Sequence, residues 1–128
     1  MRAVDVATDL LAAFNAGDLE RMRELLDPHL VAWVTNVDGE ADQVVGRDEY
    51  LNRIAAMDLP RAQYRVTLTQ SPAAIDEHLV LVMVEVQAER DNRRLHNYAA
   101  FLLRVEADRV TEWRMVDAKP AESDEFWS

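Results

Sequence analysis

Cysteine is absent from the sequence, and histidine occurs only three times. Without cysteine the chain has no disulfide framework and no thiolate to serve as a nucleophile or a metal ligand. His29, His78 and His96 stand in three separate segments and form neither an HxxH nor an HExxH pattern, the spacings typical of zinc sites. We therefore expect neither a metal site nor a cofactor.

Long apolar runs are also missing. The longest uninterrupted one extends from Leu79 to Val84, whereas a helix needs about 20 apolar residues to cross a bilayer. Near the start of the sequence, Asp5 and Asp9 interrupt the segment in which a secretory signal would be continuously apolar. These patterns predict a cytoplasmic protein that is not inserted in a membrane.

Basic residues are scarce compared with acidic ones: 14 Lys and Arg stand against 24 Asp and Glu, for a formal net charge of -10. A field of this sign repels the phosphate backbone of nucleic acids and anionic lipid surfaces. Hydrophobic residues make up 49% of the 128, which is enough for one folded domain with a real core. We expect a single domain, residues 1–128, in which residues 118–128 form a polar tail.

Three helices are predicted in the first half of the chain. Apolar residues recur at helical spacing up to Gly17, where a left-handed residue would end the first helix. The second helix begins after Asp18, a favourable N-cap residue, and stops before Pro28. The third occupies about residues 47–59. A strand at 29–36, rich in Val, Trp and Thr, separates the second and third helices and is followed by a polar loop.

From Ala62 onward the apolar residues recur at every second position, which is typical of strands. Four strands are predicted, at about 62–69, 78–90, 94–106 and 109–117, and short turns join the last three. Helices followed by successive strands predict an α+β domain with helices on one side of an antiparallel sheet.

The sheet face turned away from the helices is expected to be apolar as well. An apolar patch that covers a whole sheet face is too large to remain exposed to water on a monomer. It therefore predicts a homodimer in which two such faces pair. The interface residues that we expect are Leu81, Met83, Tyr98, Leu102 and Arg114, with His96 and Glu112 on the same face.

Three segments of the sequence have the order and spacing of motifs found in a known superfamily. They are FNAGDLERMRELLDP, VVGRDEYL and RVEADRVTEWRMVD. With them, nearly the whole chain resembles the nuclear transport factor 2-like superfamily, especially its SnoaL-like and ketosteroid isomerase-like members. The resemblance implies a cone-shaped, strongly curved antiparallel sheet wrapped around N-terminal helices, the cystatin-like fold. It also implies a pocket, which relatives use for isomerisation, cyclisation, epoxide hydrolysis or binding.

The catalytic positions of ketosteroid isomerases are not retained. Those enzymes combine an aspartate base with an oxyanion hole formed by a tyrosine and a protonated aspartate. When the shared segments are aligned, Leu10 stands at the position of the tyrosine, Trp33 at that of the base and Phe101 at that of the second aspartate. Because all three residues are apolar, we expect no ketosteroid isomerase activity.

The same correspondence implies a pocket with a mostly apolar lining, as small-molecule sites tend to have. We expect the pocket to bind a small hydrophobic metabolite, and the alternative is that the same residues fill a solid core. The residues implied to line it are Phe14, Trp33, Tyr50, Ile54, Met57, Val82, Val84, Asn97, Ala99, Phe101, Trp113 and Met115.

Asp117 is the strongest catalytic candidate of the sequence. A carboxylate at the inner end of the last strand would be partly desolvated and suited to act as a general base. Asn97 or Tyr50 would then orient the substrate of an acid–base enzyme similar to polyketide cyclases or isomerases. The alternatives are that Asp117 is a surface residue that begins the tail, and that the chain is a non-catalytic dimerisation module.

Two large aromatic residues, Phe126 and Trp127, stand in the otherwise polar tail. Adjacent aromatic side chains are rarely left in water, so we expect them to pack against the domain or its partner.

Overall fold

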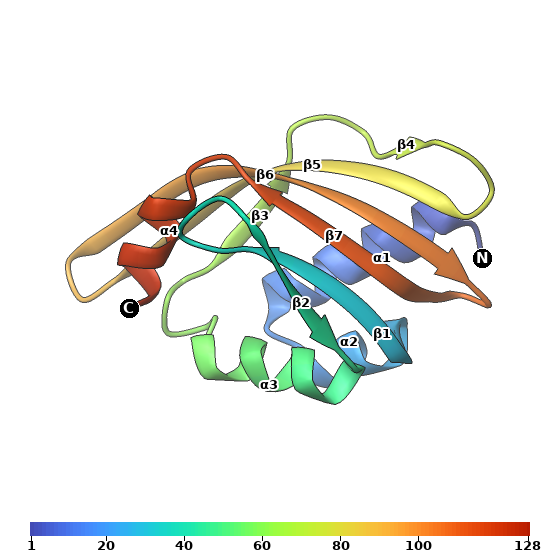
Figure 1. Ribbon diagram of the computed structural model, residues 1–128, viewed down its shortest axis with the longest axis horizontal. Coiled ribbons are helices and arrows are strands. Elements are labelled where there is room, and N and C mark those ends of the chain that lie inside the picture. The colour runs from blue at the N-terminus through green and yellow to red at the C-terminus, as the bar shows by residue number, and fades with distance from the viewer.

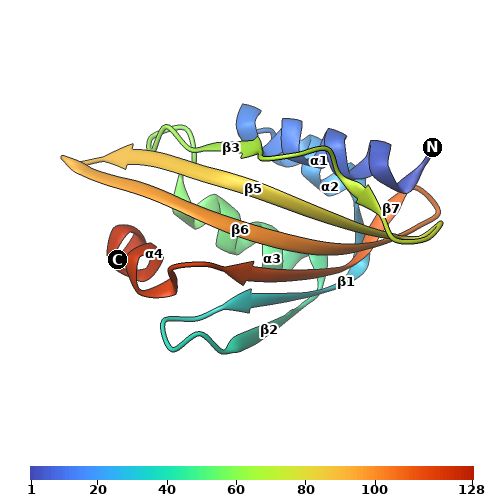
Figure 2. The same ribbon diagram turned by 90° about the horizontal axis from the view of Figure 1, so that it is seen from above.

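The computed structural model of the chain describes residues 1–128 and consists of four helices and one curved sheet (Figure 1). Helices α1, α2 and α3 cover one face of the sheet, and α4 lies beside one end of it (Figures 1 and 2). None of the helices has the length and apolar character that a bilayer crossing requires. The elements are α1 (Ala3–Ala16), α2 (Leu19–Leu25), β1 (Leu26–Thr35), β2 (Ala41–Val45), α3 (Arg47–Met57), β3 (Arg65–Leu68), β4 (Ala73–Ala74), β5 (Leu79–Arg90), β6 (Arg93–Glu106), β7 (Arg109–Asp117) and α4 (Pro120–Trp127).

The strands are ordered β2-β1-β7-β6-β5-β3, with β4 paired to β5 outside this path. All neighbours are antiparallel except β1 and β7, which run parallel. Figure 2 shows this order from above. The three long strands β5, β6 and β7 form the meander that the sequence predicts. Together with the N-terminal helices they confirm the α+β fold with a curved sheet.

The junction between α1 and α2 follows from two adjacent residues. Gly17 adopts a left-handed conformation, with φ of 64°, and ends α1 as the sequence predicts. The Asp18 side chain then accepts a hydrogen bond from the backbone N–H of Arg21 at 3.0 Å and caps α2. A Cβ at position 17 would lie 3.0 Å from Cγ of Pro60, so the corner is also too tight for a larger residue.

The inner face of the sheet forms the core with α1 and α3. Alternate residues of β5 face inward, and Val80, Val82 and Val84 are almost fully buried. From the helices, Leu10 and Phe14 pack onto this face. The inner-face alternation of β5 that the sequence predicts is therefore confirmed.

The region between the second and third helices differs from the expectation in two ways. Strand β1 begins at Leu26, directly after α2, and its pairing with β7 is interrupted between Leu26 and Val31. Pro28 lies in this interruption, where the ladder needs no donor from it. The expected polar loop contains strand β2, which pairs with β1 and forms the edge of the sheet.

The tail is not irregular, because residues 120–127 form the short helix α4. Pro120 occupies its first turn, where a missing backbone N–H costs nothing. Phe126 is only 3% exposed, which confirms that the tail packs against the domain. The sequence pattern is too polar to reveal this helix, since its formation depends on contacts with distant residues.

The outer face of the sheet carries several exposed apolar side chains, namely Met83, Tyr98 and Val116. Polar side chains on this face contact one another within the chain. Nε2 of His96 lies 2.6 Å from a carboxylate oxygen of Glu85, and Nε of Arg104 lies 3.3 Å from a carboxylate oxygen of Glu112.

Candidate functional site

A cleft of about 460 Å³ opens between the inner face of the sheet, α3 and α4. We call it the main cleft. Its apolar part comes from β1, β5, β6, β7 and α3. Its polar part lies toward α4 and the β1–β2 turn. The apolar residues are Val34, Met57, Val86, Leu95, Ala99, Phe101 and Met115, and the polar ones include Asn36, Asp42, Arg53, Asn97, Asp117, Ser123 and Asp124.

Seven of the twelve implied pocket residues do not line the main cleft. Burial explains most of these differences, because most of these side chains are packed into the core. Val82, Val84, Tyr50, Ile54 and Trp113 are buried in the core, whereas Phe14 lines a second cleft. The residues that do line the main cleft are Met57, Asn97, Ala99, Phe101, Met115 and the catalytic candidate Asp117.

Trp33 lies on the opposite face of the sheet from the one implied by the resemblance. On β1 the inward positions belong to Leu30 and Ala32, which are fully buried. The intervening Trp33 therefore points outward, because successive strand residues alternate between faces. There the guanidinium of Arg114 lies 3.8 Å from the centroid of the Trp33 ring, a cation–π contact.

Asp117 is held by a dense set of hydrogen bonds at the start of the segment leading to α4. Its Oδ1 accepts from Nδ2 of Asn97 at 2.6 Å and from the backbone N–H of Lys119 at 2.8 Å. Its Oδ2 accepts from the hydroxyl of Ser123 at 2.6 Å. These hydrogen bonds tie the end of β7 to α4.

Asn97 is the only polar residue among the buried side chains of the core. Besides its contact with Asp117, Nδ2 of Asn97 lies 3.2 Å from the backbone oxygen of Lys119 and 2.9 Å from Oγ of Ser123. Its Oδ1 accepts from the backbone N–H of Tyr98 at 2.8 Å. Because its hydrogen-bonding groups are engaged within the chain, Asn97 serves to position α4.

The other end of α4 is held by the β5–β6 hairpin. Arg90 donates to the backbone oxygen of Phe126 at 3.0 Å and lies over the rings of Phe126 and Trp127, 5.5 and 5.4 Å from their centroids. Arg93 donates to the backbone oxygen of Glu125 at 3.1 Å. Two cations at the C-terminal end of a helix also interact favourably with its dipole. Thus α4 is fixed at both ends and forms one wall of the main cleft.

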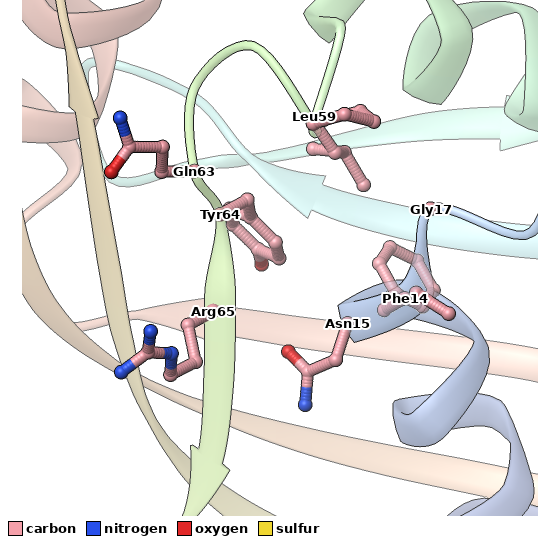
Figure 3. A pocket seen from close by; sticks show the side chains of 9 residues that line it. Phe14, Asn15, Gly17, Leu59, Gln63, Tyr64 and Arg65 are labelled. Atoms are coloured by element: carbon pink, nitrogen blue, oxygen red, sulfur yellow. The ribbon is translucent and has the colours of Figure 1, made fainter.

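A second cleft of about 460 Å³ lies between the end of α1 and residues 59–65. In Figure 3 the ring of Tyr64 points toward Phe14 across its opening, whereas Gln63 and Arg65 extend to the other side of the segment. Asn15 fixes this segment to α1 through two hydrogen bonds with the backbone of Val66, at 2.7 and 2.8 Å.

Tyr64 lines both clefts and was not singled out by sequence reasoning. A signal for it existed, because it shares the inward-facing period of Ala62 and Val66. Burial raises the pKa of Tyr64 far above its usual value of 10.0, and the negative charge of Asp117 raises it further. Burial, followed by the nearby Tyr64, also raises the pKa of Tyr50. Both phenols therefore remain neutral at physiological pH.

Comparison with known proteins adds a family. The model of the SnoaL-like domain family matches residues 7–113, which is most of the chain. No curated protein matches the sequence.

Solved structures show the same fold at low sequence identity. A protein of unknown function with a cystatin-like fold from Xanthomonas campestris is 18% identical, with a TM-score of 0.83 over 100% of this chain and 99% of that one. An epoxide hydrolase of the LEH-like type from M. tuberculosis is 19% identical, with a TM-score of 0.77 over 95% of this chain and 86% of that one. IdmH from Streptomyces antibioticus, a candidate polyketide cyclase, is 20% identical, with a TM-score of 0.76 over the full length of both chains.

Proposed function

Since the chain belongs to the family of SnoaL-like domains, we propose that it binds a small hydrophobic metabolite in the main cleft. The observation that carries this proposal is the composition of the cleft, whose lining includes the apolar side chains of Met57, Phe101 and Met115. A volume of about 460 Å³ is also in the range of small-molecule sites, roughly 300 to 1,000 Å³.

The hydrogen bonds of the polar residues in the cleft favour a role in ligand binding over a role in catalysis. Asp117 and Asn97 are engaged in hydrogen bonds that hold α4. Both side chains would have to give up these hydrogen bonds in order to contact a substrate. Affinity would then come mainly from removing apolar surface from water, at about 25 cal/mol per Å².

A thermal-shift screen against apolar metabolites, steroids and polyketides tests the proposal, because a ligand of the native state raises its unfolding midpoint. Any ligand found is then titrated into Ala99→Phe, which places a large side chain in the main cleft. We expect this variant to lose binding by tenfold or more. Ala12→Phe, on the exposed face of α1, is the matched control and should bind normally. Equal affinity in the wild type and Ala99→Phe would refute a ligand site in the main cleft.

The second candidate is an acid–base enzyme, similar to polyketide cyclases or isomerases, that uses Asp117. The observation in its favour is that Asp117 lies close enough to Tyr64 for its charge to raise the pKa of the phenol. A carboxylate base and a neutral phenol donor would thus share one cleft. This candidate requires turnover of a polyketide or ketone substrate that Asp117→Asn abolishes while ligand affinity persists. Turnover that survives the substitution would eliminate Asp117 as the base.

A further inference from the structure

The main cleft and the second cleft meet at one side chain. Each cleft has a volume of about 460 Å³, and Tyr64 is the one residue that belongs to the lining of both. Elsewhere, different residues line the two sides of the wall between them. At Tyr64 this wall is therefore one side chain thick.

The Tyr64 ring faces another aromatic side chain in each cleft. In Figure 3 it points toward Phe14 across the opening of the second cleft. On the side of the main cleft, the centroid of the Tyr64 ring lies 6.1 Å from that of Trp127 in α4. The ring thus stands between the two spaces, rather than at the outer rim of either one.

Backbone hydrogen bonds hold the chain on both sides of Tyr64. Its own N–H donates to the backbone oxygen of Leu59 at 3.1 Å, within the turn that follows α3. Two residues later, the side chain of Asn15 in α1 bonds to the backbone N–H and oxygen of Val66, at 2.7 and 2.8 Å. Strand β3, which begins at Arg65, pairs with β5. These contacts oppose a movement of the segment that would open the wall.

Apolar residues are present on both sides of the wall. Those of the main cleft include Met57, Val86 and Leu95, and those of the second cleft include Phe14, Leu59 and Pro60. An apolar chain that crossed the position of Tyr64 would therefore find apolar surface beyond it. The bulk of the Tyr64 ring, and not a change in polarity, ends the main cleft on this side.

We propose that Tyr64 limits the length of the ligand, so that the main cleft accepts compact apolar molecules and not the full length of a long alkyl chain. The proposal rests on the proposed function and adds the shape of the ligand to it. Each methylene that leaves water strengthens binding about fourfold. Where Tyr64 ends the cleft, further methylenes remain in water and add no affinity.

Straight-chain alcohols from butan-1-ol to tetradecan-1-ol measure the accepted length by calorimetric titration. In the wild type, affinity should rise with chain length and then reach a plateau. Tyr64→Ala joins the two clefts, so the rise should continue beyond that plateau, and the longest alcohol should bind about tenfold more tightly or better than to the wild type. Tyr64→Phe keeps the ring and should keep the wild-type plateau, which separates the bulk of the side chain from its hydroxyl.

A second substitution shows where the additional chain length lies. Ala16 is exposed at the end of α1 and lines the second cleft, so Ala16→Trp places a large side chain there. Added to Tyr64→Ala, it should restore the wild-type plateau, whereas alone it should leave the affinities of the wild type unchanged. Ala12→Trp, one turn earlier at an exposed position of α1, is the matched control and should not reverse the gain.

The test does not depend on one variant. Circular dichroism establishes whether Tyr64→Ala is folded, and Tyr64→Leu, which removes less volume, replaces it if it is not. In the wild type, nuclear Overhauser contacts from the chain of a bound long alcohol should reach Met115 in the main cleft but not Pro60 in the second cleft.

Failure of the proposal differs from failure of the proposed function. A plateau at the same chain length in the wild type and in the folded variant would overturn the length limit but leave binding in the main cleft intact. Contacts between the bound chain and Pro60 in the wild type would do the same. If no alcohol bound to the wild type or to the variant, both the length limit and the proposed function would be contradicted.

Discussion

Nδ2 of Asn97 lies 2.6 Å from Oδ1 of Asp117, although 20 residues separate them in the sequence. Asn97 belongs to β6 and Asp117 ends β7, and both also bond to Ser123 in α4. This contact turns the strongest catalytic candidate of the sequence into part of the structure that holds α4 against the sheet. Its consequences for stability can be measured without knowledge of a ligand.

Asp117→Asn should lower the free energy of unfolding by about 1 to 3 kcal/mol. An amide has one acceptor oxygen in place of two, and its NH₂ group would face the donors of Asn97 or Ser123. Urea denaturation of the wild type and the variant measures the difference. Asp124→Asn, an exposed change of the same chemistry on α4, should alter stability by less than about 0.5 kcal/mol. Equal stabilities of the wild type and Asp117→Asn would contradict a structural role for the carboxylate.

Phe126→Ala should destabilise the protein by about 3 kcal/mol, because it empties a buried site beneath Arg90. Chemical denaturation gives the magnitude, and hydrogen exchange of residues 118–128 shows whether α4 detaches. Truncation after Asp124 should have an effect at least as large. Glu122→Ala, at an exposed position of the same helix, is the control. An unchanged midpoint after truncation would mean that α4 does not stabilise the domain.

Alkaline pH should destabilise the fold through Tyr50 and Tyr64. Their folded-state pKa values are raised above 10.0, so the contribution of each is fully present below about pH 10. Above that pH the unfolded chain loses these protons and the folded chain keeps them. Stability therefore falls by up to about 1.4 kcal/mol per pH unit for each tyrosine.

Unfolding free energies measured across this range should show a shallower decline in the Tyr50→Phe and Tyr64→Phe variants than in the wild type. Absorbance at the tyrosinate band should rise for these residues only as the protein unfolds. Parallel pH profiles for the wild type and both variants would show that the two phenols ionise as readily in the folded state.

The outer face of the sheet is proposed as the interface of a homodimer. The expected contacts are Leu81, Met83, Tyr98, Leu102 and Arg114. In a chain with a net charge of -10, pairing of Glu112 with Arg104 on this face reduces the repulsion between two copies that meet there. Met83→Glu should weaken association tenfold or more in sedimentation experiments. Val45→Glu, at an exposed position of the edge strand β2, should not. A monomeric wild type would refute the proposal.

Much of the fold could be predicted because local patterns agree with it. Gly17 and Asp18 specify the α1–α2 corner by themselves, and the alternation along β5 identifies its buried face. The misplacement of Trp33 has a simple cause, since a shift of one residue in register moves a strand side chain to the other face. Helix α4 escaped prediction because a short helix owes its stability to tertiary contacts, here those of Phe126 with Arg90.

The sequence by itself determined one α+β domain with an apolar interior, and its lack of cysteine excluded thiolate chemistry. The tertiary structure alone decided which of the interior polar groups have partners. Asp117 and Asn97 satisfy each other, whereas Nε1 of Trp113 has no protein acceptor. The physical reason is that burial is encoded in the local period of apolar residues. Hydrogen bonding instead requires specific distances between atoms that only the folded sheet and helices bring together.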